Sequence, residues 1–211
     1  MKGRSSITWL LALALCGAAA LQGWARESTA TMPSTVRSAS APQTPAPIQT
    51  QPYWQDKTLL DKAWALPVAS RYRPDIEFQR NLTFCGPTSV ANVAHSLGMA
   101  LDQSAVLDGS GISTTLGYLP AGLTLDELSG VVRHRLPTAK VSVLRGLDLN
   151  TFRQHLRQAN EPGRRYIINF SRSPLFGQGG GHHSPIAGYL AEEDLVLVLD
   201  VNQSFGPWLV K

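Results

Sequence analysis

One cysteine opens an apolar segment with helical spacing, and it is the strongest chemical signal in the sequence. The run Cys-Gly-Pro-Thr-Ser over residues 85–89 leads into apolar residues that recur at helical spacing up to Leu97, and Gly98 is a typical stop. Cys85 therefore belongs to the first turn of a predicted helix, where unpaired N–H groups and the positive end of the helix dipole favour a reactive thiolate. The other cysteine, Cys16, lies in a segment that we expect to be removed, so Cys85 has no disulfide partner. We interpret Cys85 as a candidate nucleophile, with a buried structural cysteine as the alternative.

A histidine and an aspartate later in the chain have the chemistry to serve such a nucleophile. His182 lies in the run Gly-Gly-Gly-His-His-Ser-Pro that leads into a predicted strand, and Asp200 ends the apolar run that follows the polar turn 191–194. If the two runs form a hairpin centred near residue 192, His182 and Asp200 face each other within a few residues of register. The carboxylate would then orient the imidazole, and the imidazole would accept the thiol proton of Cys85.

Gln79 is the candidate for stabilising negative charge in the reaction. It lies six positions before Cys85. Its side-chain amide, together with the backbone N–H of Cys85, could form an oxyanion hole for a tetrahedral intermediate. A lone glutamine is more often a surface residue. The assignment therefore depends on the nucleophile, base and carboxylate being present as well.

The elements that must position these residues are helical first and strand-like afterwards. A capping box, Thr124 with Glu127, predicts the start of one helix, and Pro137 predicts its end. The predicted helices cover 59–66, 85–97, 125–136 and 150–158, and the predicted strands cover 140–144, 166–170, 184–190 and 195–201. Helices followed by a sheet predict an α+β domain rather than a doubly wound one.

The N-terminal stretch has the pattern of a secretory signal peptide. Two basic residues precede an apolar run over residues 7–21, and small residues at the positions that a signal peptidase reads predict cleavage after Ala25. The apolar run is too short for a membrane span. Cys16 follows the bulky Leu15, which argues against a lipoprotein site. Residues 1–25 are therefore predicted to be a signal peptide, and the protein is predicted to be periplasmic.

The rest of the chain divides into a linker and one domain. Residues 26–51 are rich in Ser, Thr, Ala, Pro and Gln and are predicted to be a disordered linker. Residues 52–211 are long enough for a single domain with its own core. The whole chain has 19 basic and 15 acidic residues, and the predicted cleavage removes Lys2 and Arg4. With so small an excess and no basic block, we expect no nucleic-acid partner, and the sequence leaves a homodimer open.

Four stretches together resemble the phytochelatin synthase family. They are Gln79, residues 84–93 (Phe-Cys-Gly-Pro-Thr-Ser-Val-Ala-Asn-Val), residues 181–189 (Gly-His-His-Ser-Pro-Ile-Ala-Gly-Tyr) and residues 197–201 (Leu-Val-Leu-Asp-Val). The resemblance covers most of the chain after about residue 51. It implies a papain-like fold, in which a helical part carrying the nucleophile packs against an antiparallel sheet carrying the histidine and the aspartate.

The resemblance also implies roles for single positions. Cys85 matches the nucleophile, His182 the general base, Asp200 the orienting carboxylate and Gln79 the oxyanion-hole residue. Arg172 matches an arginine near the bound γ-glutamyl group, where a guanidinium suits carboxylates by bidentate pairing. An ordinary surface arginine is the alternative.

Gly181 begins the Gly-His-x-Ser-Pro stretch and is assigned with Arg172 to the substrate site. No metal ligand is assigned. His183 follows His182 directly and would point to the opposite face of the strand.

The implied reaction is attack on the Cys–Gly bond of glutathione, which forms a γ-glutamylcysteinyl thioester and releases glycine. Water then hydrolyses the acyl-enzyme, or a second glutathione accepts the acyl group to make phytochelatin. The chemistry requires no cofactor, although a cadmium or zinc thiolate of glutathione is a candidate substrate or activator. The sequence lacks the Cys-rich C-terminal region of plant members and stops before a helical stretch with which the family normally continues. We therefore expect a short or truncated C-terminal end, and hydrolysis more readily than peptide synthesis.

Two other functions remain open at this level. A papain-like double-glycine peptidase also places a glutamine ahead of a Cys-Gly helix start, but it lacks the Gly-His-x-Ser-Pro stretch. A non-catalytic protein could hold thiol peptides or a thiophilic metal through Cys85. Such a protein would have no need for an oriented base.

Overall fold

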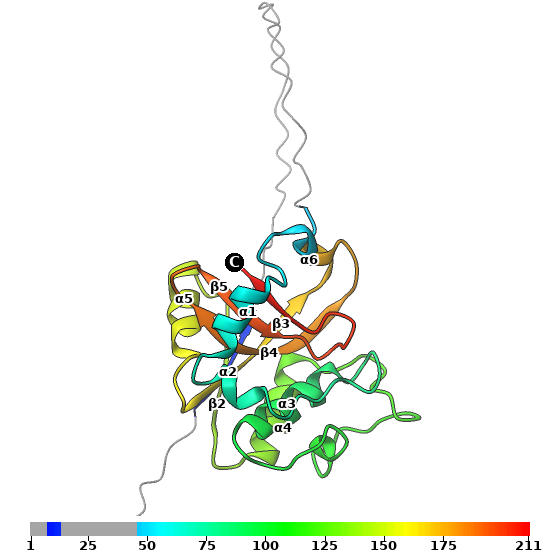
Figure 1. Ribbon diagram of the computed structural model, residues 1–211. Helices are drawn as coiled ribbons and strands as arrows, with labels where there is room; N and C mark the ends of the chain where they lie inside the picture. Colours follow the sequence, from blue (N-terminus) through cyan, green and yellow to red (C-terminus); the bar gives the residue numbers. More distant parts are fainter. Residues whose placement is uncertain (1–7, 14–45) are drawn as a thin grey trace, which may run out of the picture.

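The computed structural model describes residues 8–13 and 46–211 and combines helices with one six-stranded sheet (Figure 1). The strands lie in the order β2-β1-β3-β4-β5-β6. The elements are β1 (Thr8–Leu13), η1 (Ile48–Thr50), α1 (Lys57–Trp64), α2 (Ala69–Tyr72), α3 (Cys85–Ser96), η2 (Ala105–Leu107), α4 (Leu125–Arg135), β2 (Lys140–Arg145), α5 (Leu149–Gln158), β3 (Arg164–Ser171), α6 (Ser173–Phe176), β4 (Gly181–Leu190), β5 (Leu195–Leu199) and β6 (Pro207–Val210). No helix in the described part of the chain is long and apolar enough to cross a membrane.

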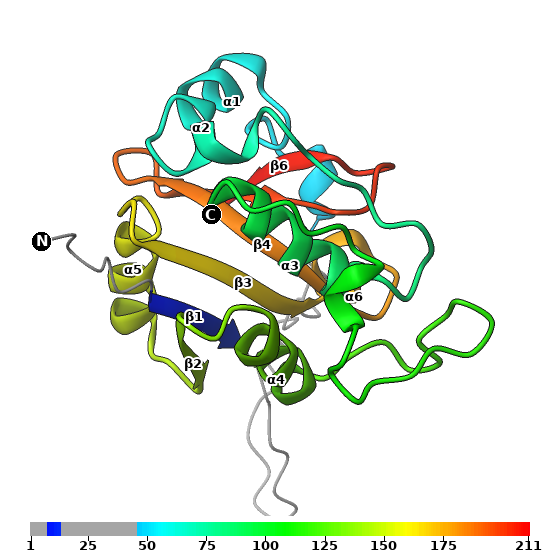
Figure 2. The ribbon, with the colours of Figure 1, turned by 90° about the horizontal axis from the view of Figure 1, so that it is seen from below.

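Each face of the sheet buries its own apolar cluster. Alternate residues of a strand point to opposite faces, and β5 follows this rule, since Leu197 belongs to one cluster while Val196 and Val198 belong to the other. The first cluster joins the sheet to α1, α2, α3 and α4. The second joins it to α5, α6 and the segment around Trp54. Figure 2 shows α3 in front of the sheet and α5 at the left, beside the ends of β1 and β3.

The mixed α+β class predicted from the sequence is confirmed, but the sheet is not antiparallel throughout. Strands β3 to β6 are antiparallel, whereas β1 runs parallel to both β2 and β3. The sequence assigned Thr8–Leu13 to a signal peptide and predicted no strand there. An apolar run without charges matches both the core of a signal peptide and a buried parallel strand, so periodicity cannot separate them. The remainder of the predicted signal peptide lies outside the described residues.

A short 3-10 helix, η1, lies before the predicted start of the domain at residue 52. Most of the predicted linker lies outside the described residues, but Ile48 in η1 is only 5% exposed and packs in the same cluster as Trp54. η1 and the apolar contact of Ile48 thus lie within the stretch that the sequence assigns to the linker. A single apolar residue in a polar run gives no periodic signal, so sequence patterns could not detect it.

Helix α3 lies at the centre of the helical layer and is buried along almost its whole length. Every residue from Cys85 to Ser96 except His95 is buried. Such complete burial requires each polar side chain to find a partner: Thr88 Oγ1 donates to the carbonyl of Phe84 at 2.7 Å, and Ser89 Oγ donates to that of Cys85 at 2.7 Å. The predicted helix over 85–97 is confirmed to within one residue.

The predicted capping box at the start of α4 is also confirmed. Thr124 Oγ1 accepts from the Glu127 N–H at 3.2 Å, and Glu127 Oε2 accepts from the Thr124 N–H at 2.7 Å. Thr124→Ala should therefore lower the free energy of unfolding by about 1 kcal/mol, measured by urea denaturation. The control is Thr114→Ala at an exposed loop position, which should change it by less than about 0.5 kcal/mol. Equal losses in the two variants would contradict the capping role.

Candidate active site

Cys85 is the first residue of α3, is 6% exposed and is a free cysteine. The N-cap residue, Phe84, makes no side-chain capping bond, so the helix start keeps its N–H groups for other partners. Burial alone would raise the pKa of the Cys85 thiol. The hydrogen bond with His182, the imidazolium charge, and the backbone N–H groups of His183 and Gly86 outweigh it and lower that pKa below its usual value.

His182 lies near the start of β4 and connects the thiol to a carboxylate. Its Nε2 lies 2.9 Å from Asp200 Oδ1, which leaves Nδ1 for the thiol of Cys85. Burial would lower the pKa of this imidazole, but the hydrogen bonds and charges of Asp200 and Cys85 raise it overall. The edge-on ring of Phe170, 5.6 Å away between centroids, packs against the imidazole. These contacts favour a thiolate–imidazolium pair.

Asp200 follows β5 directly, is fully buried and faces hydrogen-bond donors only. Besides His182, Arg172 Nη2 donates to both carboxylate oxygens at 2.8 Å, Trp208 Nε1 donates to Oδ2 at 3.1 Å, and the Asn202 N–H donates to Oδ1 at 2.9 Å. Burial would raise the pKa of this carboxyl. The hydrogen bond with His182, the imidazolium charge and the Arg172 charge lower it overall, so the carboxylate stays ionised.

Arg172 lies beside the carboxylate and is surrounded by aromatic rings. Its guanidinium carbon is 4.2 Å from the ring centroid of Phe205 and 5.3 Å from that of Phe176. Its Nη1 is buried and has no hydrogen-bond partner among the described residues. The surface alternative is therefore wrong, because Arg172 is 8% exposed and is bound to Asp200. A contact of Nη1 with substrate stays a prediction.

The backbone of Gln79 is hydrogen-bonded to the residue that follows Asp200. Its N–H donates to the carbonyl of Val201, the residue after Asp200, at 2.8 Å. The side-chain Oε1 is buried without a partner among the described residues. Gly181, the other predicted substrate-site residue, is exposed at the first position of β4 and pairs with Ser171. A Cβ at Gly181 would meet no atom within 4 Å.

The structure thus brings Cys85, His182, Asp200 and Arg172 together and ties the Gln79 backbone to the same place. Two contacts of the carboxylate, from Trp208 and Asn202, escaped the sequence analysis. A buried tryptophan N–H usually finds an acceptor, so the Pro-Trp run after Asp200 could have suggested the first. The Asn202 contact depends on the turn that follows β5, and no pattern in the sequence indicates it.

His183 has a structural contact of its own. Its Nε2 lies 2.9 Å from the carbonyl oxygen of Leu123, and burial lowers its pKa to about 4, so the ring is neutral. It ties β4 to the loop before α4. Within residues 8–13 and 46–211, no three histidine, cysteine, aspartate or glutamate side chains group closely enough to hold a metal ion.

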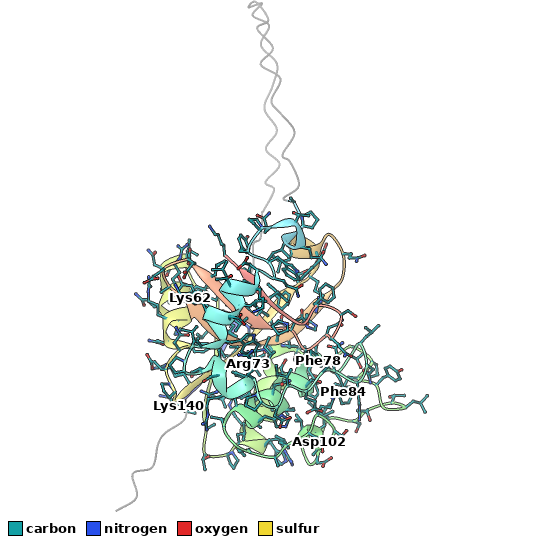
Figure 3. All side chains as sticks on the ribbon, in the orientation of Figure 1. Lys62, Arg73, Phe78, Phe84, Asp102 and Lys140 are labelled. Atoms are coloured by element: carbon teal, nitrogen blue, oxygen red, sulfur yellow. The ribbon has the colours of Figure 1, made fainter. Side chains whose placement is uncertain are left out.

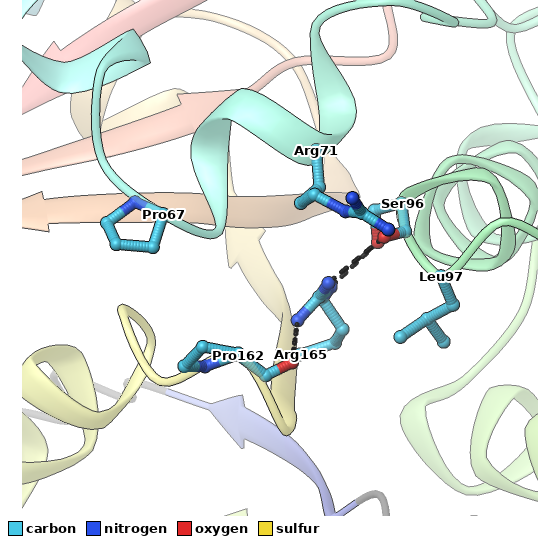
Figure 4. Close-up of a pocket in the computed structure, with 6 residues that line it drawn as sticks. All are labelled: Pro67, Arg71, Ser96, Leu97, Pro162 and Arg165. Atoms are coloured by element: carbon cyan, nitrogen blue, oxygen red, sulfur yellow. Dashed lines mark hydrogen bonds between the residues drawn. The ribbon is translucent and has the colours of Figure 1, made fainter.

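A cavity of about 370 Å³ lies at the other end of α3 from Cys85 (Figure 4). It is lined by Pro67, Arg71, Ser96, Leu97, Pro162 and Arg165. Arg165 donates to Ser96 Oγ at 2.7 Å, to the Ser96 carbonyl at 3.1 Å and to the Pro162 carbonyl at 2.9 Å. Its guanidinium therefore satisfies the Ser96 carbonyl at the C-terminal end of α3 and the Pro162 carbonyl, which accounts for a buried arginine that has no carboxylate partner among the described residues.

Comparison with known proteins identifies the family of this chain. The chain is 46% identical over 54 residues to glutathione gamma-glutamylcysteinyltransferase 1 of Triticum aestivum, and 52% identical over 40 residues to glutathione gamma-glutamylcysteinyltransferase 3 of Lotus japonicus. These matches cover 25% and 19% of this chain but only 11% and 8% of the two relatives. A model of the phytochelatin synthase family matches residues 54–211. That match spans most of the chain, which belongs to the phytochelatin synthase family.

Proposed function

We propose that this chain cleaves the Cys–Gly bond of glutathione through an acyl-enzyme on Cys85 and releases glycine and γ-glutamylcysteine. The observation that carries the proposal is the 2.9 Å contact between the His182 imidazole and the buried Asp200 carboxylate, together with the effect of this imidazole, which lowers the pKa of the Cys85 thiol. A protein that only binds thiols has no use for such a set. The names of the two relatives describe transfer of a γ-glutamylcysteinyl group from glutathione, which supports the substrate class.

The reaction proceeds in two acyl-transfer steps. His182 accepts the thiol proton, and the thiolate of Cys85 attacks the carbonyl carbon of the Cys–Gly bond. The backbone N–H of Cys85 and the side-chain amide of Gln79 stabilise the tetrahedral oxyanion. The intermediate expels the amine of glycine, to which His182 returns the proton, and a thioester remains on Cys85. Asp200 holds the imidazole in orientation throughout.

Water or a second thiol peptide completes the reaction. With water, His182 acts as general base and the product is γ-glutamylcysteine. With the amino group of a second glutathione as acceptor, the product is phytochelatin. A cadmium or zinc thiolate of glutathione would enter as a substrate, and the buried Nη1 of Arg172 is available for a substrate carboxylate.

The proposed fold is papain-like and the proposed location is the periplasm. A papain-like arrangement is supported by α3, which begins at Cys85, and by the contact between His182 on β4 and Asp200 just after β5, whose Nε2 and Oδ1 atoms lie 2.9 Å apart. The signal peptide 1–25 and the linker would deliver this domain to the periplasm, and cleavage after Ala25 would remove β1 (Thr8–Leu13) from between β2 and β3.

The test is product analysis with purified full-length chain and glutathione, with and without cadmium. Without cadmium, wild type should release glycine and γ-glutamylcysteine in equal amounts. Longer peptides formed with cadmium would add transfer to a second glutathione, and Cys85→Ser should release neither product above background. Cys16→Ser removes the other cysteine and should match wild type.

Three outcomes would overturn the proposal. A folded wild type that leaves glutathione intact would exclude the activity. Cleavage of a double-glycine peptide in place of glutathione would establish a peptidase. A stoichiometric glutathione adduct without glycine release would establish a binding protein.

A further inference from the structure

The segment 77–80, which carries Gln79, has no regular secondary structure, yet its backbone is held by the side chain of Asn92. Asn92 lies on α3, two turns after Cys85. Its Oδ1 accepts from the Glu77 N–H at 3.0 Å, and its Nδ2 donates to the Glu77 carbonyl at 2.8 Å. One amide side chain therefore satisfies both backbone groups of a single residue, as a neighbouring strand would.

The side-chain amide of Gln103 bonds the backbone on both sides of Gln79. Its Nε2 donates to the Phe78 carbonyl at 2.9 Å, and its Oε1 accepts from the Arg80 N–H at 2.9 Å. The Gln79 N–H between them donates to Val201. Phe78 and Phe84, labelled in Figure 3, lie along the stretch that leads from this segment to Cys85.

Further hydrogen bonds fix which way each amide faces. Gln103 Nε2 also donates to Glu77 Oε1 at 2.6 Å, and its Oε1 also accepts from Thr88 Oγ1 at 3.0 Å. Asn92 Nδ2 also donates to the Thr88 carbonyl at 2.9 Å. Asn92 is fully buried and Gln103 is 7% exposed. An isosteric carboxylate at either position would place an oxygen against carbonyl oxygens, at a large desolvation cost.

These bonds connect the candidate oxyanion residue to both other parts of the site. Asn92 and Thr88 belong to the helix that carries Cys85, and Val201 follows Asp200 in the chain. An oxyanion donor must lie within a few tenths of an ångström of the developing charge, and a side chain on an irregular segment has that accuracy only when its backbone is fixed.

We propose that Asn92 and Gln103 are positioning residues that hold Gln79 at the tetrahedral intermediate formed on Cys85. The inference rests on the proposed acyl transfer at Cys85. It concerns residues that do not touch the reacting atoms, and their effect passes through Gln79.

The test is a double-mutant cycle in the full-length chain. Gln103→Glu keeps the shape of the side chain and should lower kcat roughly thirtyfold, because small displacements of a positioned group cost up to about a hundredfold. In a Gln79→Ala background the same substitution should cost less than about threefold, because the group that it positions is already gone. Asn92→Asp should lower kcat in each of the two backgrounds by a factor similar to that of Gln103→Glu.

Two further readouts separate positioning from general damage. The rate at which iodoacetamide alkylates Cys85, followed against pH, should match wild type in Gln103→Glu, since the thiol and imidazole are untouched. The matched control is Asn160→Asp. Asn160 pairs in the same two-bond manner with the backbone of Tyr189, seven residues along β4 from His182, and its substitution should lower stability without lowering kcat.

Equal losses of kcat in both backgrounds, or a shifted alkylation profile in Gln103→Glu, would overturn the inference. If Gln103→Glu does not fold, Gln103→Met removes the same hydrogen bonds without adding charge. Its kcat loss is then compared in the wild-type and Gln79→Ala backgrounds in the same way. If wild type does not cleave glutathione, acylation of Cys85 by p-nitrophenyl acetate supplies the rate for the cycle. Failure of the proposed function and failure of this inference are then separate results.

Discussion

His182→Gln should slow alkylation of Cys85 by iodoacetamide at pH 7 by about a hundredfold, because each unit of thiol pKa changes the thiolate fraction about tenfold below that pKa. In wild type, burial raises the pKa of the thiol, and the His182 hydrogen bond and charge lower it by more. Glutamine keeps a polar side chain at the position but removes the positive charge. The burial of Cys85 remains, so the thiol pKa should rise above its usual value.

The measurement is the alkylation rate against pH, with loss of free thiol as the readout. In wild type the rate should rise with pH through a pKa below 9.0, the usual value, and in His182→Gln the rise should move to higher pH. The pKa of His182 is raised, so the imidazolium that pairs with the thiolate is lost only above the usual histidine range. The control is His95→Gln, on the same helix but bonded to Asp75. A wild-type rate in His182→Gln at pH 7 would contradict the ion pair.

The elements that the sequence predicted correctly are those specified by residues close together in the chain. Helix α3 combines helical spacing with a glycine stop, and Gly98 has a φ of 77°, which glycine adopts without strain. The β4–β5 hairpin has the polar turn 191–194 between two apolar runs, and Leu190 pairs with Leu195 as a turn at that place requires. Such elements can be predicted because the residues that determine them are neighbours in the sequence.

The parts that were not predicted depend on contacts between distant segments. The Arg172–Asp200 ion pair joins residues 28 apart and requires the register of β3 on β4 and of β4 on β5, including a shift between Ile186 and Gly188. Strand β6 is four residues long and was missed, although its Trp208 contacts Asp200. Residue types predicted which groups could react. Only the packed sheet shows what surrounds the carboxylate.

The surroundings of Asp200 explain why an aspartate, rather than an asparagine, suits this position. A neutral amide has one oxygen and one NH₂ group. Every group that faces Asp200 is a donor: the Arg172 guanidinium, the Trp208 indole, the Asn202 N–H and the His182 ring. Either orientation of an amide would therefore place NH₂ against donors, and Arg172 would be left buried with a positive charge and no anion.

Asp200→Asn should accordingly lower the free energy of unfolding by about 3 kcal/mol or more and lower kcat by about a hundredfold or more, since it disturbs both the ion pair and the orientation of the imidazole. The measurements are urea denaturation at pH 7 and the rate of glycine release. The folded-state pKa of Asp200 is lowered, so the stability that its ionised form contributes is fully present above pH about 4 and is lost as the pH falls through the lowered pKa. The stability difference between wild type and variant should therefore shrink in acid.

The matched control for Asp200→Asn is Asp194→Asn in the β4–β5 turn. Asp194 pairs with Arg153, and both side chains are more than a third exposed, so solvent screens the pair. Its φ of 54° suits asparagine as well as aspartate. Asp194→Asn should change stability by less than about 1 kcal/mol and leave kcat unaltered. If Asp200→Asn is as mild as this control, the buried carboxylate neither balances Arg172 nor orients His182, and the base must be held by other contacts.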